Sequence, residues 1–436
     1  MSKDAIITNE QAEKTAVLGK DWFKIDNAGK IYPASGTNKW NAVFRVTAIM
    51  NELVDIAILQ KAVDDVMDRF PTYNVTLKKG MFWFYLQQLD RTPTVTFDQN
   101  SPCMPFNLSS GGHLVRITHY RYRIAIEMFH ALSDGTGGLI FLNSIVARYL
   151  ELKNINITYG NSLALNHRDK PTENEVEDTF LRVADLKECS TRSGRRCFYI
   201  KGTKEEKGSS NVVSFVMDEK QLKEIGLKYH SSITQFLSAN LLLAIYDLKE
   251  QSKSKLSAVI ELPINLRKIF ASKTIRNFAY FTHIKMPHRE GGYSVEDAIS
   301  IVQNGIRQGT DKDYLMRNIN ANVRDESNLF LRLIPRPIKT FGMNIAFELF
   351  SDRIISTVFS ALGRVEAPKE FQPHINRYEM VIGAPKLNNY ACTAISYNNN
   401  YVMSFCKHIV DSPLETALLS RLAQYGIKPT IENNME

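Results

Sequence analysis

The chain has few cysteines and lacks the usual signatures of a metal site. Its 436 residues include nine histidines, none in HExxH or a related spacing, so we predict no metal centre. The five cysteines include no CxxC pair, which excludes a disulfide framework and predicts reduced thiols. They are Cys103, Cys189, Cys197, Cys392 and Cys406.

Long apolar runs and common nucleotide motifs are also missing. No stretch of about 18 apolar residues occurs, so no transmembrane helix is predicted. Residues 1–10 lack the apolar core of a secretion signal, and with the reduced thiols this predicts a cytoplasmic protein. A Walker A lysine, a GxGxxG fingerprint, a GxSxG elbow and a long basic run are all absent. These absences argue against a P-loop enzyme, a dinucleotide-binding domain, an α/β-hydrolase and a nucleic-acid-binding protein.

The overall composition is that of a globular protein with a positive charge. Apolar residues make up 44% of the chain and charged residues 23%. The chain has 54 lysine and arginine residues and 46 aspartate and glutamate residues, which gives a net charge of +8. This surplus fits an anionic partner, such as a phosphorylated cofactor or an acidic carrier protein, and it equally fits a solubilising surface.

Strand and helix patterns alternate through two similar halves of the chain, which predicts an α/β protein with mixed sheets and flanking helices. The chain is too long for one ordinary core, and residues 185–210 are polar and glycine-containing. We therefore predict two domains with their active site at the interface between them. The predicted division is a flexible tail over 1–17, an N-terminal domain over 18–190, a linker over 191–210 and a C-terminal domain over 211–436.

One motif carries most of the functional information, His130-Ala-Leu-Ser-Asp134-Gly135. It follows a predicted strand over 123–129 and precedes a predicted helix over 139–150. A histidine at a strand end, before a glycine turn, presents its ring to a cavity, and a neutral imidazole suits general-base work at neutral pH. A packed or surface histidine is the plainer interpretation. Asp134 either acts on His130 or fixes the loop, and the spacing favours the second role, with Gly135 allowing the bend.

These six residues match the HxxxDG motif, and the chain resembles the chloramphenicol-acetyltransferase-like superfamily. That superfamily includes plant BAHD acyltransferases, peptide-synthetase condensation domains, polyketide-associated acyltransferases and alcohol acetyltransferases. The motif lies about a third of the way along the chain, as it does in members of that superfamily. Phe129 stands where condensation domains commonly carry a first histidine, and the plant DFGWG motif is absent. The chain therefore most resembles bacterial alcohol-acetyltransferase-like or condensation-like proteins.

Other segments extend the resemblance over roughly residues 15–430. Residues 41–50 resemble the opening strand of these proteins. Residues 262–267, followed by residues 274–278, resemble the segment whose arginine pairs with the motif aspartate. Residues 359–363 resemble the Ser-Asn-Leu-Gly element near the channel, although Ala361 replaces the usual asparagine.

The resemblance implies two chloramphenicol-acetyltransferase-like domains that form a V-shaped pseudo-dimer, a monomer with a tunnel between its halves. It implies that His130 is the general base, that Asp134 pairs with Arg267, and that Gly135 supports the loop. Ser360 and Gly363 are the candidates for contacts to the oxyanion or the tunnel. No permanently bound cofactor is expected.

The implied co-substrate is acyl-CoA, or the acylated phosphopantetheine of an acyl or peptidyl carrier protein, and the implied acceptor is a small alcohol or amine. Three functions stay open. The first is O- or N-acyl transfer from acyl-CoA. The second is a stand-alone condensation-like enzyme with carrier-bound substrates, and the third is a catalytically inactive docking or scaffold protein. The intact His130, Asp134 and Gly135 favour an enzyme.

Overall fold

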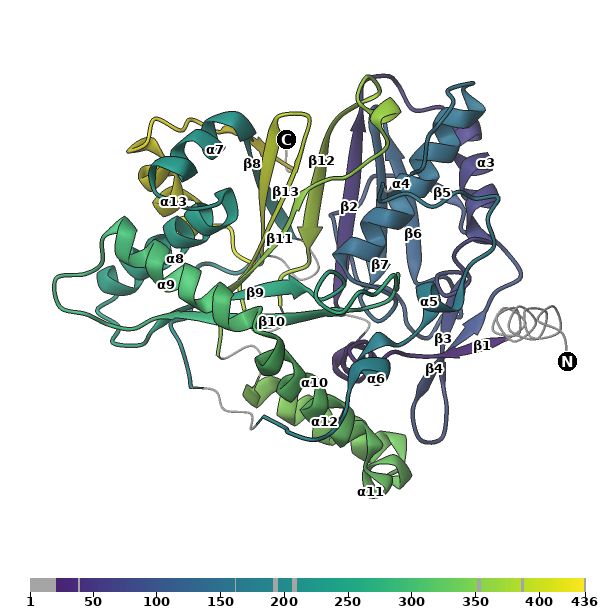
Figure 1. The fold of residues 1–436 in the computed structure, drawn as a ribbon, viewed down its shortest axis with the longest axis horizontal. Helices are drawn as coiled ribbons and strands as arrows, with labels where there is room; N and C mark the ends of the chain where they lie inside the picture. Colours follow the sequence, from purple (N-terminus) through teal and green to yellow (C-terminus); the bar gives the residue numbers. More distant parts are fainter. Residues whose placement is uncertain are drawn as a thin grey trace, which may run out of the picture.

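The computed structural model describes residues 21–37, 40–160, 162–190, 195–205, 210–350, 354–385 and 388–434, without the side chains of 329 and 345–350. The predicted tail over 1–17 lies outside these residues, as do 191–194 and 206–209 of the predicted linker. Two sheets stand side by side, each covered by helices, so the chain is a mixed α/β protein as predicted (Figure 1). Within the described residues, no helix is long and apolar enough to cross a membrane.

The first sheet has five strands and carries the HxxxDG motif at the end of its central strand. Their order is β12 (Ile375–Ile382), β2 (Val43–Met50), β7 (Arg123–Phe129), β6 (Val115–Tyr120) and β5 (Val95–Phe97). The helices α3 (Ile56–Met67) and α4 (Gly135–Leu152) pack against it. Both helices bury an apolar side against the strands, because sheet and helix each need a partner for their apolar surface.

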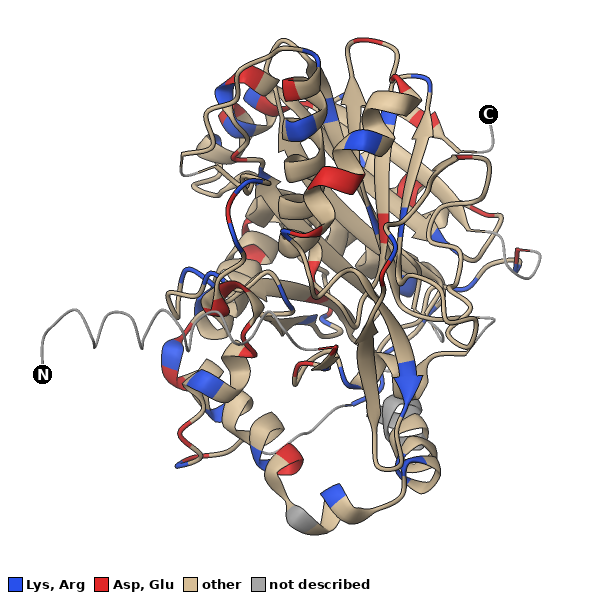
Figure 2. Ribbon diagram, turned by 90° about the vertical axis from the view of Figure 1, so that its right-hand side faces the viewer, with Lys and Arg blue, Asp and Glu red and all other residues tan. Residues whose placement is uncertain are grey.

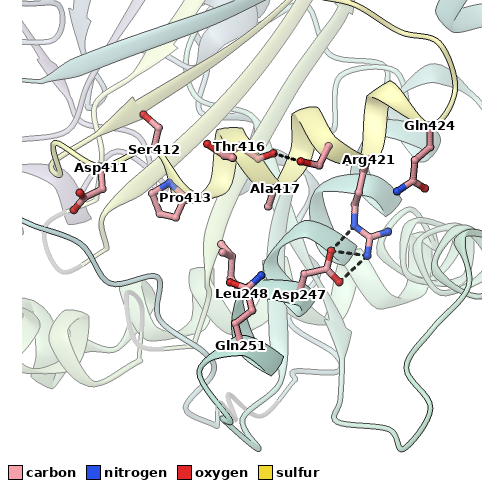
Figure 3. Close-up of a pocket in the computed structure, with 11 residues that line it drawn as sticks. Asp247, Leu248, Gln251, Asp411, Ser412, Pro413, Thr416, Ala417, Arg421 and Gln424 are labelled. Carbon is pink, nitrogen blue, oxygen red and sulfur yellow. Dashed lines mark hydrogen bonds and ion pairs between the residues drawn. The ribbon is translucent and has the colours of Figure 1, made fainter.

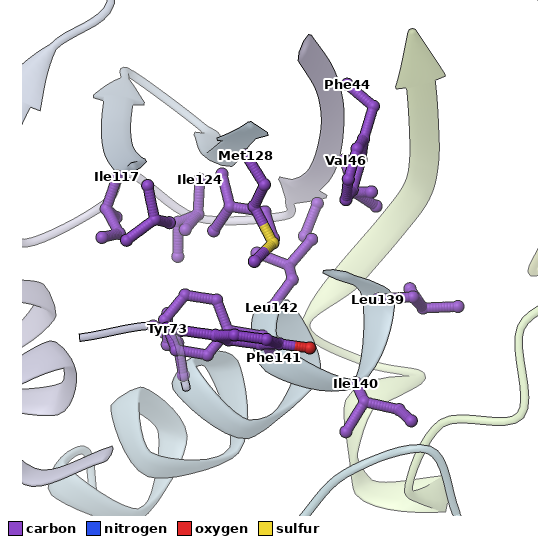
Figure 4. Close-up of a cluster of buried hydrophobic side chains, with 14 of the residues drawn as sticks. Phe44, Val46, Tyr73, Ile117, Ile124, Met128, Leu139, Ile140, Phe141 and Leu142 are labelled. Atoms are coloured by element: carbon purple, nitrogen blue, oxygen red, sulfur yellow. The ribbon is translucent and has the colours of Figure 1, made fainter. Parts of the chain in front are cut away.

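The core under α4 shows how this helix is held in place (Figure 4). Leu139 and Phe141 of α4 pack in one cluster with Phe44 of β2 and Met128 of β7, and all four are at most 2% exposed. Burying side chains of this size stabilises the fold by roughly 1.5–3 kcal/mol each. The first turn of α4, which follows the motif directly, is therefore fixed against the sheet.

The second sheet has seven strands, and a small third sheet has three. The second runs β10 (Ala279–Met286), β9 (Ala258–Asn265), β11 (Thr357–Arg364), β13 (Tyr390–Tyr397), β14 (Asn400–Lys407), β8 (Asn211–Asp218) and β15 (Thr430–Asn433). The third runs β1 (Trp22–Lys24), β4 (Phe84–Gln88) and β3 (Val75–Lys79).

Helices of the second half cover its sheet or extend to one end of the molecule. Those packed on the sheet are α7 (Glu219–Lys228), α8 (Ile233–Gln251), α9 (Val295–Gly309) and α13 (Pro413–Ala423). Those at the lower end of Figure 1 are α10 (Lys312–Ser327), α11 (Leu329–Leu333) and α12 (Arg336–Phe350). The short helical segments are α2 (Ile31–Ser35), α5 (Glu173–Val176), α6 (Thr179–Val183) and η1 (Lys369–Phe371).

One strand departs from the predicted division of the chain. We predicted that 211–436 forms its own domain, but β12 pairs antiparallel with β2, with Met380 opposite Val46. The same strand contacts the second sheet, because the Thr393 hydroxyl of β13 donates to the Met380 carbonyl at 2.5 Å. For this strand the prediction is wrong: the C-terminal part of the chain completes the N-terminal sheet and joins it to the second.

The β9–β10 hairpin extends from the second sheet towards the first (Figure 1). Its loop, residues 266–278, reaches the start of α4, where the Phe278 N–H donates to Asp134 at 2.8 Å. This loop supplies most of the second half's contacts to the motif.

Candidate active site

His130 stands at the end of β7 with its ring held between two aromatic side chains. The backbone N–H of His130 donates to the Ala42 carbonyl at 2.9 Å, which continues the pairing of β7 with β2. The ring stacks on Tyr32, with centroids 4.6 Å apart, and meets the edge of Phe44 at 5.2 Å. The residue stays partly exposed, whereas the neighbouring Phe129 and Ala131 are fully buried. The ring is thus fixed in direction, while part of the residue remains exposed.

Asn277, from the β9–β10 loop, determines which nitrogen of His130 carries the proton. Its Nδ2 donates to the His130 carbonyl at 3.0 Å and to Asp26 at 3.2 Å. If the amide were flipped, its oxygen would face these two acceptor oxygens and no hydrogen bond could form. Its Oδ1 therefore faces His130 Nδ1, at 3.2 Å, and accepts a hydrogen bond from it. The proton of the neutral ring is on Nδ1, which leaves the Nε2 lone pair free to accept another.

Asp26 lies behind Asn277 and is fully buried. It accepts from the Gly29 N–H at 2.6 Å and from the Asn277 N–H at 3.3 Å, and the Arg276 guanidinium is 3.6 Å away. Burial raises the pKa of Asp26 above its usual 3.8, and Arg276 with these donors opposes the rise. The carboxyl thus anchors the amide that orients His130.

Burial also sets the proton affinity of the histidine. It lowers the pKa of His130 below the usual 6.5, because the charged imidazolium loses hydration, while Asp134 and the Asn277 hydrogen bond oppose this shift. The imidazole is therefore neutral at pH 7, which is the form that accepts a proton.

Asp134 and Arg267 form a buried, two-pronged ion pair between the halves. The guanidinium donates to both carboxylate oxygens, at 2.9 and 3.0 Å, and each side chain is under 10% exposed. Asp134 also caps α4 by accepting from the Gly137 N–H at 3.1 Å. Arg267 further donates to the carbonyls of Thr274 and Arg276. Nothing in this set brings the carboxylate to the imidazole, so Asp134 holds the loop.

Gly135 of the motif and Gly137, two residues later, are both closely surrounded by other residues. We expected Gly135 to allow a sharp bend, but its φ is not positive; a Cβ there would lie 2.8 Å from Met380 and 3.1 Å from Leu362. At Gly137 a Cβ would lie 2.0 Å from Ser133 Oγ and 2.1 Å from the Ile275 carbonyl oxygen. The β9–β10 loop therefore approaches Gly137 more closely than a side chain would permit, whereas the contacts at Gly135 come from the flexible ends of Met380 and Leu362.

Ser133 has a structural position and does not meet His130. Its hydroxyl donates to the Ile275 carbonyl at 2.5 Å, and Tyr73 donates to it at 2.9 Å. These bonds tie the motif to the β9–β10 loop. A nucleophilic role for Ser133 has no support in this geometry.

The two remaining predicted residues lie on β11. Ser360 is 8% exposed and faces Thr393 in the sheet, and Gly363 ends a bulge with φ +75°, a conformation that favours glycine. Between them, Leu362 is the residue that approaches Gly135. β11 thus reaches the motif through Leu362, and no hydrogen bond joins Ser360 or Gly363 to His130.

Two surface cavities in the described part of the chain lie away from the imidazole. One, of about 600 Å³, opens between α8 and α13 around the Asp247–Arg421 ion pair (Figure 3). The other, of about 290 Å³, lies beside α2, α12 and the β3–β4 hairpin. His130 lines neither. Within the described residues, no group of three or more His, Cys, Asp or Glu side chains is arranged to hold a metal.

Sequence reasoning missed three residues that organise His130. Asp26, Tyr32 and Asn277 reach it from segments about 100 residues or more away along the chain. Asn277 lies inside a segment that the resemblance singled out for its arginine. That proximity is the one signal that pointed towards it.

Comparison with solved structures gives extensive matches at low identity. Polyketide synthase associated protein 5 from Mycobacterium tuberculosis matches with TM-score 0.65 and 12% identity, over 93% of this chain and 98% of that one. TRI3 trichothecene 15-O-acetyltransferase from Fusarium sporotrichioides matches with TM-score 0.58 and 10% identity, over 92% and 93%. The starter condensation domain of rhizomide synthetase RzmA matches with TM-score 0.57 and 10% identity, over 94% of each chain. No family model and no curated protein sequence matches this chain.

These likenesses define the fold. The chain has the chloramphenicol-acetyltransferase-like fold of condensation domains and acyltransferases, with two pseudo-domains. The resemblance stated from the HxxxDG motif is confirmed at this level.

Proposed function

We propose that the protein transfers an acyl group from a thioester, acyl-CoA, to an alcohol or amine, with His130 as the general base. The observation that carries the proposal is the Asn277–His130 hydrogen bond, which leaves Nε2 unprotonated in a partly open position. A base held in one tautomer by a positioned amide is an arrangement that proton abstraction requires and packing does not.

In the proposed step, the acceptor hydroxyl or amine attacks the thioester carbonyl carbon while Nε2 of His130 takes its proton. The tetrahedral intermediate then collapses, the carbon–sulfur bond breaks, and the imidazolium returns the proton to the leaving thiolate. The products are an ester or amide and a free thiol. No covalent acyl-enzyme forms, which agrees with the structural engagement of Ser133.

The oxyanion of that intermediate needs donors close to its oxygen. Ser360, and the backbone N–H groups near Gly135 and Gly363, remain the candidates, because β11 and the start of α4 meet at Leu362. The proposed tunnel would run between the two sheets at this seam, with the donor and acceptor entering from opposite sides.

The net charge of +8 supports a phosphorylated donor. One neighbour, the starter condensation domain, was solved in complex with C8-CoA and Leu-SNAC. The second candidate function, condensation with carrier-bound substrates, draws on the same class of neighbours. A scaffold without catalysis has no need for the neutral, oriented imidazole and is the weakest of the three.

The test is thiol release. The protein is incubated with acetyl-CoA or octanoyl-CoA and a panel of small alcohols and amines, and free thiol is measured. We expect acceptor-dependent release, a fall of at least about a hundredfold in His130→Ala, and little change in His288→Ala, a histidine on an exposed loop. Release only from an acylated carrier protein would instead establish the condensation-like function. Unchanged release by His130→Ala would reject the base.

A further inference from the structure

Two segments at one end of the molecule combine exposed apolar side chains with positive charge and no negative charge. They are residues 78–84, at the tip of the β3–β4 hairpin, and residues 329–344, covering α11 and the first part of α12. They contain Lys78, Lys79, Arg332, Arg336 and Lys339, and neither contains aspartate or glutamate. We call these two segments together the apical surface. The whole chain, by contrast, contains 54 basic and 46 acidic residues.

The two segments contact each other and form one surface. The Arg336 N–H donates to the Met81 carbonyl at 3.0 Å, and the Lys339 ammonium donates to the Phe82 carbonyl at 3.3 Å. The Lys339 ammonium also lies 5.2 Å from the Trp83 ring centroid. The hairpin and the helices project from the same end of the molecule, and in Figure 2 the hairpin at lower right shows blue segments and no red.

Apolar side chains project outward from the apical surface. Phe330 is 84% exposed, Met81 73%, Phe341 70% and Ile338 65%. On α12, Ile338 and Phe341 are three residues apart and share the outer side, while Thr340 turns inward to the cavity beside the hairpin. Large apolar side chains gathered in this way on a surface mark an interaction site.

We propose that the apical surface docks the protein onto an anionic lipid membrane. Its apolar side chains are strongly exposed, and lipid chains take up such side chains at any spacing, whereas a folded protein needs a matching pocket for each. The exposed Lys79 and Arg332 complement anionic headgroups, which attract lysine and arginine close to a membrane surface. Apolar insertion beside cationic attraction is the pattern of proteins that lie on a bilayer without crossing it.

A cavity lies between this surface and α2, the helical segment that contains Tyr32. The 290 Å³ cavity is lined by Leu77 and Phe84 beside the hairpin, Thr340 and Asn344 of α12, and Pro33 and Ala34 of α2. The residue before Pro33 is Tyr32, which stacks on His130. A cavity lined by both apolar and polar side chains thus lies between the proposed docking surface and the segment that holds the imidazole. The docking proposal itself is independent of the acyl-transfer proposal, because its test measures binding.

The test is vesicle co-sedimentation of the full chain. Vesicles of phosphatidylcholine with about a third phosphatidylglycerol are compared with pure phosphatidylcholine at low and high salt. We expect binding to the anionic vesicles that weakens in high salt. The double variant Ile338→Ser/Phe341→Ser should bind at least ten times more weakly, and Lys79→Gln/Arg332→Gln should lose the dependence on anionic lipid. Leu227→Ser is the matched control, since Leu227 is 64% exposed on α7, and it should bind like wild type.

Three outcomes would overturn the proposal. The first is no sedimentation with either vesicle. The second is a dimer by light scattering that Ile338→Ser/Phe341→Ser converts to a monomer without any vesicle binding, which would assign the surface to a second copy of this chain. The third is equal vesicle binding by wild type and both double variants, which would place any membrane contact elsewhere.

Discussion

The amide of Asn277 faces the imidazole of His130 in one orientation only. Its Nδ2 is used by the His130 carbonyl and by Asp26, so its Oδ1, 3.2 Å from Nδ1, can only accept. The histidine is therefore prepared as a base before any substrate arrives. This relationship assigns Asn277 a positioning role and gives it a test separate from that of His130.

Asn277→Ala should lower kcat by about tenfold or more, because the neutral ring then divides between two tautomers and part of the general-base advantage is lost. KM should change little. The matched control is Asn143→Ala, which removes another fully buried asparagine with two hydrogen bonds, to Leu163 and Tyr378. Both variants should melt at lower temperature, but only Asn277→Ala should lose turnover. Equal turnover losses in steady-state assays would make Asn277 purely structural.

The pH profile should reflect the lowered pKa of His130. In kcat/KM against pH, activity should rise as the imidazole loses its proton, with a midpoint below 6.5, because burial disfavours the charged ring. The lowered pKa of His130 also affects the stability of the fold. Between this pKa and 6.5, the unfolded chain binds more protons at His130 than the folded protein does. The contribution of His130 to the free energy of unfolding therefore rises with pH in this range. A midpoint at or above 6.5 in the purified enzyme would contradict the burial argument.

Breaking the Asp134–Arg267 pair should destabilise the fold strongly. Arg267→Ala leaves a buried carboxylate with its cation removed, which costs roughly 3–5 kcal/mol of unfolding free energy in urea titrations. Arg421→Ala provides the control: it removes an equally two-pronged pair with Asp247, which is partly exposed, and should cost about 1 kcal/mol or less. Similar losses in both variants would mean that burial does not matter at this pair.

Replacing Gly137 and Gly342 by alanine should distinguish the effect of a steric clash from the effect of helix propensity. Gly137→Ala places a Cβ about 2 Å from Ser133 Oγ and the Ile275 carbonyl oxygen, so the motif or the β9–β10 loop must shift. We expect a loss of several kcal/mol, on the order of other overpacked sites, together with a loss of activity. Gly342→Ala, on α12 with open space around it, should be neutral or stabilise by up to about 1 kcal/mol. Thermal melting of both variants measures the contrast.

Local pattern predicted many elements correctly. The strand predicted over residues 123–129 has these bounds in the structure, because five of its seven residues are apolar and a turn precedes it. The helix predicted to begin at Leu139 begins at Gly135, since Asp134 caps it and the glycines form its first turn. Because glycine has a low helix propensity, the sequence alone predicted a loop for Gly135, Gly137 and Gly138.

The pairing between distant segments could not be predicted from the sequence. Nothing in the residues of β12 says that its partner is β2, more than 300 residues earlier. The resemblance, not the pattern, placed Arg267 beside Asp134. Asn277 and Asp26 had no local signal, because their roles arise only when three separate segments converge on His130.

The position of β12 also determines when the first sheet is completed during synthesis. β12 is an edge strand of that sheet, and its residues, 375–382, emerge from the ribosome after most of the 436-residue chain has been made. Until then β2 is itself an unpaired edge, which is the kind of surface that associates with other chains. A truncation before residue 375 should therefore leave this edge exposed and aggregate more readily than the full chain.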